Sequence, residues 1–476
     1  MQKLFEILKK IMLAILLALI TLGLLLSVIQ GLRYHSYLVT LAAGLLWSTV
    51  LVFILRRFKF PALKASQACA LITVLCFIVN LAWVLIIRIE PFSDYETYWS
   101  AAAALASGGE LTNPWYLAMY PHILGYSSFL SVFIRIFGAH VMVAALLNVV
   151  LTCISGILIF AIAKELCSLR TACIAELIWA LLPTRTMLNS LVLSEPLYTC
   201  LILLFIWALI RIDRDSSYML WKYALLGLLL GLLLFWINIV RPIAAILIIA
   251  LFIRLLFLGG LDFRNRSNIL AWLVLIAVML LCCRTAGKLW DAHIEKLLSL
   301  EPASVPIYNI YVGFNEQTQG QWSGEDMDLL FSYLQQPGVS ASQAQSMMLP
   351  HLIERISSGI DYGRLFMSKL FVFLGNDELG GYTYRFTRSE TFVKICMVID
   401  NAAYYGILFG SLPGIFSLWK KRGNSVFLML PLYVIGLTLA HMLIEVSSRY
   451  HYSIIPMLII LAALGFERAA EGRSTL

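Results

Sequence analysis

The chain has 476 residues and a formal net charge of +8; hydrophobic residues make up 61% of it and charged residues only 13%. This composition excludes an ordinary soluble globule, in which about a quarter of the residues are charged. The basic residues lie in short clusters between apolar runs and form no patch with interleaved aromatic residues, so no nucleic-acid partner is expected. About 20 apolar residues let a helix cross the hydrocarbon core, and this length recurs about a dozen times, which predicts an all-α polytopic membrane protein.

The first apolar run follows Lys3, Lys9 and Lys10, is long for a signal peptide and has no small-x-small cleavage site, so an uncleaved first helix is expected. Hydropathy predicts twelve spans in all, with these approximate bounds: 11–29, 38–55, 67–88, 140–164, 170–184, 190–210, 222–239, 243–258, 268–284, 392–417, 425–443 and 452–467.

Charge predicts the orientation of these spans. With the amino terminus inside, the short basic connections all fall on the cytoplasmic side. Counting 121–138 as a further span would reverse the orientation of every later span and place the basic connections outside. This stretch is therefore predicted to be a helix at the outer interface, with His122 and Arg135 in the headgroup zone. The protein is expected to be integral to the cell (inner or plasma) membrane. It divides into a transmembrane module (1–286) with a first external loop (89–139), a second external region (287–391) and carboxyl-terminal transmembrane helices (392–476).

Asp94 is the first candidate functional residue, because it follows the third span directly in the stretch PFSDYETYWSA. A carboxylate that is partly desolvated at a membrane surface is suited to act as a general base toward an acceptor hydroxyl. If a helix continues from it, Tyr98 and Ala101 share its face. The alternative is that Asp94 is a helix N-cap, and the two roles do not exclude each other.

Glu195 and four arginines lie near the predicted outer ends of spans. A carboxylate inside an apolar segment usually faces a cavity or a partner, although a structural ion pair explains Glu195 equally well. These arginines lie on the predicted outer side, although basic residues are usually more frequent on the cytoplasmic side. They are Arg88, Arg185, Arg241 and Arg449. Guanidinium groups suit an anionic phosphate, and snorkelling to lipid phosphates is the alternative for any one of them.

The stretch HMLIEVSSRYHY (441–452) places His441, Glu445 and Arg449 at helical spacing. A continued helix would put all three on one stripe, with Glu445 paired to Arg449. A structural ion pair accounts for Glu445 and Arg449 equally well, but it leaves Tyr450 and His451 unexplained.

Several kinds of site are missing from the sequence. It has no Walker loop, no GxGxxG after a strand, no HExxH and no GxSxG, so a cytosolic nucleotide donor is not expected and an outward-facing site favours a lipid-linked one. The nine cysteines lie in or beside apolar segments and indicate neither a disulfide framework nor a zinc site. No metal ligands or cofactor are predicted.

Five stretches together resemble the membrane-embedded GT-C glycosyltransferases, especially the bacterial members of glycosyltransferase family 39, which are related to protein O-mannosyltransferases and aminoarabinose transferases. They are PFSDYETYWSAAAALASGGE (91–110) with YPHILGYSSFLSVFIRIFG (120–138), LLPTRTMLNSLVLSEPLY (181–198), NIVRP (238–242), GFNEQTQGQWSGED (313–326) and EVSSRYHYSIIPMLIILAALG (445–465). Their order and spacing fit that family over nearly the whole chain.

The resemblance implies an inverting transferase that uses a polyprenyl-phosphate sugar, with Asp94 as the catalytic base. Donor-phosphate contacts then fall on Arg449 and Arg241, with Arg185 and Tyr450 as further candidates. The supporting candidates are Glu96, Tyr98, Glu195 and His122, and the role of Glu195 stays open. Protein O-mannosyltransferases have two adjacent acids at this place, whereas here Tyr95 separates Asp94 from Glu96. The role of Glu96 is therefore in doubt. The family has no uniform metal requirement.

The expected partners are a polyprenyl-phosphate sugar donor, membrane lipids, and a lipid, glycan or protein acceptor. The sequence specifies neither the sugar nor the acceptor. Two other functions remain open: an oligosaccharide ligase or polymerase that uses lipid-linked donors, and a transporter or flippase of lipid-linked sugars. The ionisable residues gather near the ends of spans, with Glu195 the deepest, whereas a transporter predicts interrupted helices at mid-membrane.

Overall fold

The structure of the protein is a computed structural model that describes residues 2–33, 35–57, 63–303, 305–420 and 425–471, and the regular elements within these ranges are all helices. Within these ranges no strand is present. The predicted all-α class is therefore confirmed.

Ten helical stretches within the described ranges are long and apolar enough to cross a membrane. The helices in them are α1 (Gln2–Arg33), α2 (His35–Arg57), α3 (Ala65–Ile86), α7 (Val141–Leu166), α10 (Glu195–Asp213), α11 (Leu220–Val240), α13 (Arg266–Leu298), α19 (Glu390–Lys420), α20 (Met429–Leu443) with the 3-10 turn η3 (Ser425–Leu428), and α21 (Ile455–Ala470) with the 3-10 helix η4 (Ser448–Ile454).

Two of the twelve predicted spans are not among these ten, because their helices are too short. The stretch 170–184 forms α8 (Leu169–Ala180), which stops before Pro183, the first residue of the short helix α9 (Pro183–Leu188). Proline suits a first helical turn and cannot continue a preceding helix, which explains the break. The stretch 243–258 forms α12 (Ala244–Phe257), a shorter apolar helix.

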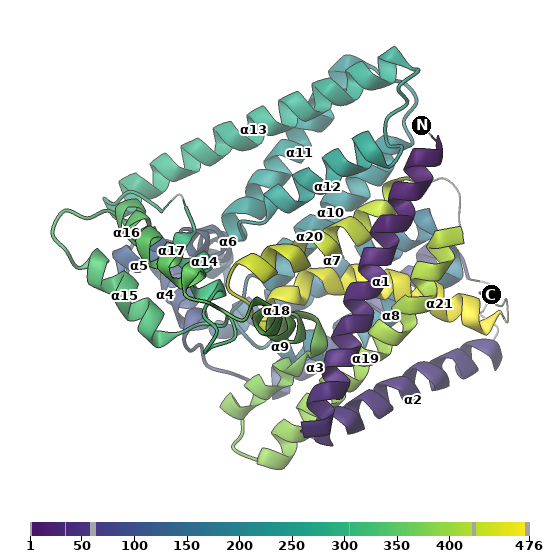
Figure 1. Ribbon diagram of the computed structural model, residues 1–476, viewed down its shortest axis with the longest axis horizontal. Coiled ribbons are helices and arrows are strands. Elements are labelled where there is room, and N and C mark those ends of the chain that lie inside the picture. Colours follow the sequence, from purple (N-terminus) through teal and green to yellow (C-terminus); the bar gives the residue numbers. More distant parts are fainter. Residues whose placement is uncertain (1, 34, 58–62, 304, 421–424, 472–476) are drawn as a thin grey trace.

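The remaining helices gather at one end of the bundle, called here the site end. They are α4 (Asp94–Ser107), α5 (Pro114–Met119), α6 (His122–Phe137), α14 (Ile307–Gly313), α15 (Gly324–Leu334), α16 (Ala341–Met347), α17 (Leu349–Ser357), α18 (Tyr362–Leu370), the π-helical turn η1 (Phe371–Gly375) and the 3-10 helix η2 (Glu378–Arg385). Figure 1 shows α4, α5 and α14–α17 together on the left, away from both chain ends. The stretch 121–138 is thus the short helix α6, as predicted, and not a further long span.

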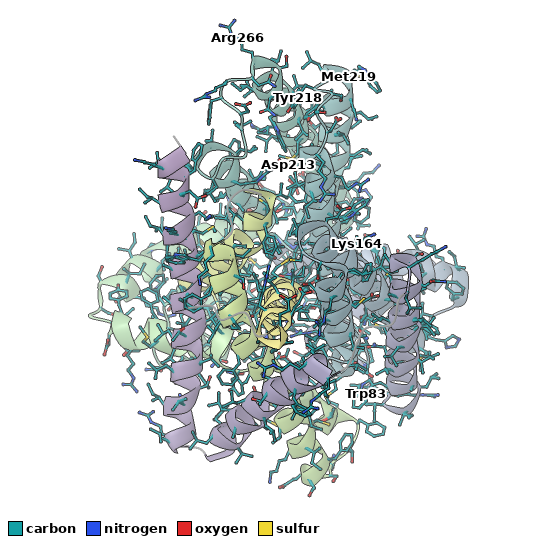
Figure 2. The ribbon with its side chains drawn as sticks, turned by 90° about the vertical axis from the view of Figure 1, so that its right-hand side faces the viewer. Trp83, Lys164, Asp213, Tyr218, Met219 and Arg266 are labelled. Carbon is teal, nitrogen blue, oxygen red and sulfur yellow. The ribbon has the colours of Figure 1, made fainter. Side chains whose placement is uncertain are left out.

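The opposite end of the molecule carries the connections that follow α10 and α12. Figure 2 shows Asp213, Tyr218, Met219 and Arg266 close together there, where the α10–α11 and α12–α13 connections lie. The predicted boundary between residues 286 and 287 falls inside α13, which continues to Leu298 toward the site end.

Helix α21 occupies the centre of the bundle and is buried from Ile455 to Glu467. Helices α2, α8 and α19 pack around it, and the close approach of α19 depends on glycine: a Cβ atom at Gly414 would collide with the carbonyl oxygen of Leu461. Because α21 follows η4 directly, its rigid burial also fixes η4 at the site end.

Helices α11 and α13 pack closely through small residues on α11. A Cβ atom on Gly227 would lie 2.5 Å from the carbonyl oxygen of Leu275, and one on Gly231 would lie 2.6 Å from that of Met279. Small residues let helix backbones approach in this way inside membranes. This contact sets the position of α11, whose C-cap is Arg241.

Replacing Gly227 by alanine is therefore expected to lower the free energy of unfolding by about 1–3 kcal/mol, the usual cost of overpacking. Thermal unfolding in detergent measures the effect. Gly287→Ala in α13 is the matched control, because a Cβ atom added there would meet nothing within 4 Å, and alanine in a helix interior is favoured over glycine by roughly 0.5–1 kcal/mol. Equal melting temperatures for the two variants would contradict the packing role of Gly227.

Candidate active site

Three chain segments meet around the guanidinium group of Arg449. Asp94 Oδ2 lies 3.1 Å from Arg449 Nη2, and Glu195 Oε1 lies 3.2 Å from Arg449 Nε. Arg449 Nη1 also donates a hydrogen bond of 2.9 Å to the hydroxyl of Tyr95. The result is one guanidinium held between two carboxylates, and we call Asp94, Tyr95, Glu195 and Arg449 the arginine centre.

Both carboxylates belong to the first residue of a helix. Asp94 begins α4 and Glu195 begins α10. The partial positive charge of a helix N-terminus stabilises a carboxylate at this position. Ser93, with φ of 50°, is the N-cap of α4, so Asp94 is not the cap and its side chain is directed to Arg449.

Exposure differs sharply within the arginine centre. The Asp94 side chain is 47% exposed, while those of Arg449 and Glu195 are 11% and 2% exposed. A buried guanidinium stays charged and needs anionic partners, which Glu195 supplies from inside. Asp94 is therefore the member of the centre that a molecule from solution reaches.

Helix α4 is fixed at its other end and along one side by α6. The Arg135 guanidinium donates hydrogen bonds to the carbonyl oxygens of Leu105 and Ala106, and so caps the C-terminus of α4. The hydroxyl of Ser127 donates to the carbonyl oxygen of Tyr98 at 3.0 Å, and the Tyr98 ring packs edge-on against Tyr126. These contacts hold Asp94 in place.

Arg449 lies in η4, not on a continuation of α20, so the predicted stripe of His441, Glu445 and Arg449 is wrong. Helix α20 ends at Leu443, and the Glu445 backbone N–H donates to the carbonyl oxygen of Asn309 at 2.8 Å. This hydrogen bond to a distant segment replaces the one that the Glu445 N–H would make within a continued α20. Glu445 Oε1 accepts a hydrogen bond of 2.9 Å from the Tyr450 hydroxyl, and Nδ1 of His441 contacts the carbonyl oxygen of Glu445.

Two further candidates lie close to the centre. The guanidinium carbon of Arg241 is 4.4 Å from the centre of the Tyr450 ring, and that of Arg449 is 5.8 Å from it, so two cations flank one aromatic ring. His122 packs edge-on against Tyr120; burial, with the nearby charges of Arg241 and Arg449, lowers its pKa to about 3. The His122 ring is therefore neutral at neutral pH.

Other candidates are not brought to the arginine centre. Glu96 and Arg88 are exposed. Arg185 is fully buried, and its Nη2 atom lies 3.3 Å from the Asp377 carboxylate oxygens. Its guanidinium carbon is 4.2 Å from the centre of the Tyr452 ring. Arg185 thus belongs to a second polar cluster.

This second cluster is centred on Asp377, which the sequence did not single out. Besides Arg185, its carboxylate accepts from the hydroxyl of Thr184 at 2.7 Å and contacts Nε2 of His451 at 3.0 Å. Its backbone N–H donates to Asn401. Asp377 therefore ties α9, η4 and α19 together, and it accounts for the buried His451.

Replacing Asp377 by asparagine leaves Arg185 buried without a carboxylate, so a loss of about 3 kcal/mol in unfolding free energy is expected. Burial raises the pKa of Asp377, but Arg185 and His451 outweigh it and hold that pKa below the ordinary 3.8. A depressed carboxyl pKa stabilises the fold above the unfolded value and loses this effect as the pH falls through the folded value.

The difference in melting temperature between the wild type and Asp377→Asn should therefore be full at neutral pH and shrink only below about pH 3.8. Asp361→Asn, the same change at an exposed N-cap of α18, is the control and should be close to neutral, because asparagine caps as well as aspartate. A similar small effect at both positions would contradict the proposed bracing role of Asp377.

Within the described ranges, no three His, Cys, Asp or Glu side chains lie together in a way that would hold a metal ion. The closest acids at the centre, Asp94 and Glu195, are bridged by a guanidinium. The arginine centre offers a half-exposed carboxylate, Asp94, beside a mostly buried guanidinium, Arg449.

A scan against models of protein families finds no match, and a search of curated proteins finds none either. Among solved structures, the chain is similar to an oligosaccharyltransferase of Archaeoglobus fulgidus tethered with an acceptor peptide (12% identity, TM-score 0.47, 83% of this chain and 49% of that one). It is also similar to the oligosaccharyltransferase AglB of that organism in complex with an inhibitory peptide and dolichol-phosphate (14% identity, TM-score 0.48, 83% and 50%).

A third similar structure is ArnT from Cupriavidus metallidurans bound to undecaprenyl phosphate (10% identity, TM-score 0.39, 86% of this chain and 79% of that one). The chain spans about half the length of the archaeal enzymes it matches. At these identities and TM-scores, the similarity does not assign an activity to this chain.

Proposed function

We propose that the protein is a membrane glycosyltransferase of the GT-C type, which moves a sugar from a polyprenyl-phosphate donor to an acceptor hydroxyl at the extracytoplasmic face. The observation that carries the proposal is the arginine centre. A half-exposed carboxylate, Asp94, lies 3.1 Å from a buried guanidinium, Arg449, at one end of a bundle whose described residues include ten candidate spans.

The donor phosphate binds to Arg449, with Arg241 as a second cation across the Tyr450 ring. Guanidinium groups bind phosphate oxygens through paired N–H donors, and low exposure strengthens the interaction. Glu195 balances the charge of Arg449 from the buried side, with Oε1 3.2 Å from Nε. The isoprenoid tail stays in the lipid between helices.

Asp94 acts as the general base. It accepts the proton of the acceptor hydroxyl while the oxygen attacks the anomeric carbon. The bond from that carbon to the phosphate oxygen breaks, and polyprenyl phosphate leaves with the electron pair, stabilised by the two arginines. A single displacement of this kind inverts the anomeric configuration.

The test uses purified protein in detergent with a panel of polyprenyl-phosphate monosaccharides, and follows the release of polyprenyl phosphate. The proposal expects release from at least one donor, dependent on an added acceptor. Movement of a lipid-linked sugar across a vesicle membrane without that product would favour a flippase and overturn the proposal. Transfer only from long lipid-linked oligosaccharides would favour a ligase or polymerase.

A further inference from the structure

A cluster of tyrosines surrounds Glu445 beside the arginine centre. Tyr116 lies in α5 and Tyr120 follows it, with 4.9 Å between their ring centres. Tyr308, from α14, packs against Tyr120 with 6.5 Å between ring centres. Together with Glu445 and its partner Tyr450, these residues are called here the tyrosine cluster; they come from three distant parts of the chain.

The position of Glu445 is fixed by the second external region. Its backbone N–H bonds to Asn309, the neighbour of Tyr308 in sequence, and the next residue, Val446, donates to the carbonyl oxygen of Gly320. Lys369 Nζ donates to the carbonyl oxygens of Gly313 and Ile444 and joins the two segments again. The carboxylate of Glu445 is therefore held rigidly next to the tyrosines.

The charge of Glu445 affects the pKa values of the tyrosines in the cluster. Burial raises the pKa values of Tyr116, Tyr120 and Tyr308, and the charge of Glu445 raises each of them further. Burial likewise raises the pKa of Glu445 itself, against a hydrogen bond from Tyr450 that lowers it. The charge of Glu445 thus acts on all three tyrosines, and the Tyr450 hydroxyl contacts its carboxylate directly.

Two hydroxyls of the cluster are buried without a hydrogen-bond partner within the described ranges: those of Tyr120 and Tyr308. Tyr308 is only 1% exposed. A buried hydroxyl without a partner costs about 1–3 kcal/mol, so proteins seldom keep one, and two side by side next to a carboxylate indicate a polar ligand. Such hydroxyls together with aromatic faces suit the hydroxyls and the apolar face of a sugar ring.

The cluster also adjoins the proposed phosphate site. The Tyr450 ring lies between the cations of Arg241 and Arg449, and its hydroxyl reaches Glu445. The charge of Asp94 raises the pKa of Tyr116. Tyr450 thus links the tyrosine cluster to both arginines, so a group bonded to a phosphate held by the arginines lies beside the cluster.

We propose that the tyrosine cluster is the binding subsite for the sugar of the donor, and that it selects a neutral sugar with free hydroxyls. The hydroxyls of Tyr120 and Tyr308 bond to the sugar, and Glu445 accepts from its hydroxyls. A uronic acid is excluded, because its carboxylate would face that of Glu445 in a buried site. This assignment rests on the proposed glycosyl transfer for the identity of the donor.

The first arm of the test measures binding alone. Saturation-transfer NMR is recorded with the purified protein and neutral methyl glycosides, and with methyl glucuronide for comparison. The wild type should bind a neutral glycoside and not the glucuronide. Glu445→Gln should weaken binding about 10-fold or more, and Tyr308→Phe or Tyr120→Phe about 3- to 10-fold, as expected for the loss of a charged and a neutral hydrogen bond.

Stability separates binding from a structural role. Removing a hydroxyl that has no protein partner should leave the melting temperature of Tyr308→Phe unchanged or raised. Tyr223→Phe is the control: Tyr223 is equally buried, but it lies at the opposite end, in α11, where its hydroxyl bonds to the carbonyl oxygen of Asp215. That variant should bind sugar as the wild type does. A fall in melting temperature for Tyr308→Phe with unchanged sugar binding would overturn the proposal.

The second arm uses the donor panel. The cluster variants should lower kcat/KM for the preferred donor more than for the other donors, so that the ratio between these kcat/KM values falls. The inhibition constant of polyprenyl phosphate without a sugar should stay the same. An equal loss for all donors would overturn the subsite. If the wild type binds a glycoside but releases no polyprenyl phosphate from any donor, the proposed function fails and the sugar site stands.

Discussion

Asp94→Asn is expected to lower the rate of polyprenyl phosphate release by about 10²- to 10⁴-fold, the usual contribution of a general base. The amide keeps the size of the side chain but cannot accept the proton of the acceptor. Because the phosphate is held by the arginines, donor affinity should change much less than turnover. Single-turnover release, together with equilibrium binding of a labelled donor, measures the two effects separately.

Glu110→Gln is the matched control for Asp94→Asn. It makes the same change from a carboxylate to an amide in the same loop, at an exposed position beyond the C-terminus of α4. Its turnover should stay within about twofold of the wild type, as is usual for a surface change. Wild-type turnover in Asp94→Asn, or a loss of donor affinity as large as the loss of turnover, would contradict the role of Asp94 as a base.

Arg449→Ala is expected to cause the second large effect, on both binding and stability. It removes the cation nearest to Asp94 and leaves Glu195, 2% exposed, buried without its partner. Breaking a buried ion pair costs about 3–5 kcal/mol, and losing a charged contact weakens donor binding by a similar amount. Thermal unfolding and donor binding in detergent measure the two losses.

A compensated variant separates these losses. Arg449→Met combined with Glu195→Gln removes both buried charges, so most of the stability should return, since buried ion pairs are often replaceable by neutral groups. Donor binding should not return, because no guanidinium remains to bind the phosphate. Donor affinity at the wild-type level in the folded double variant would contradict the phosphate role of Arg449.

Most of the helical framework can be predicted from the sequence, because hydropathy over about 20 residues is a local signal. The start of a helix at Asp94 is local as well. Predictions failed at a proline inside a mostly apolar stretch and at a helix end that depends on distant partners. The stretch 170–184 holds only two charged residues, Arg170 and Glu176, but Pro183 divides it into α8 and α9. Helix α20 stops before Glu445 because Asn309 and Gly320 supply its backbone partners.

The site could be predicted only in part, for a similar reason. Asp94, Glu195 and Arg449 were each singled out by charge near the end of a span, but no spacing links residues 94, 195 and 449. Asp377 gave no signal, because its partner Arg185 is 192 positions away. The tyrosine cluster was also missed: Tyr116 and Tyr120 lie in the first external loop and Tyr308 in the second external region, far apart in the sequence, and only the fold brings them together.

The anomeric configuration of the transferred sugar, determined by NMR on the product of the wild-type enzyme, tests the central claim most directly. If the Asp94 carboxylate takes the acceptor proton and never bonds to the sugar, one displacement occurs and the configuration is inverted relative to the polyprenyl-phosphate donor. Retention would exclude a single displacement from the face opposite the phosphate and would contradict the role assigned here to Asp94.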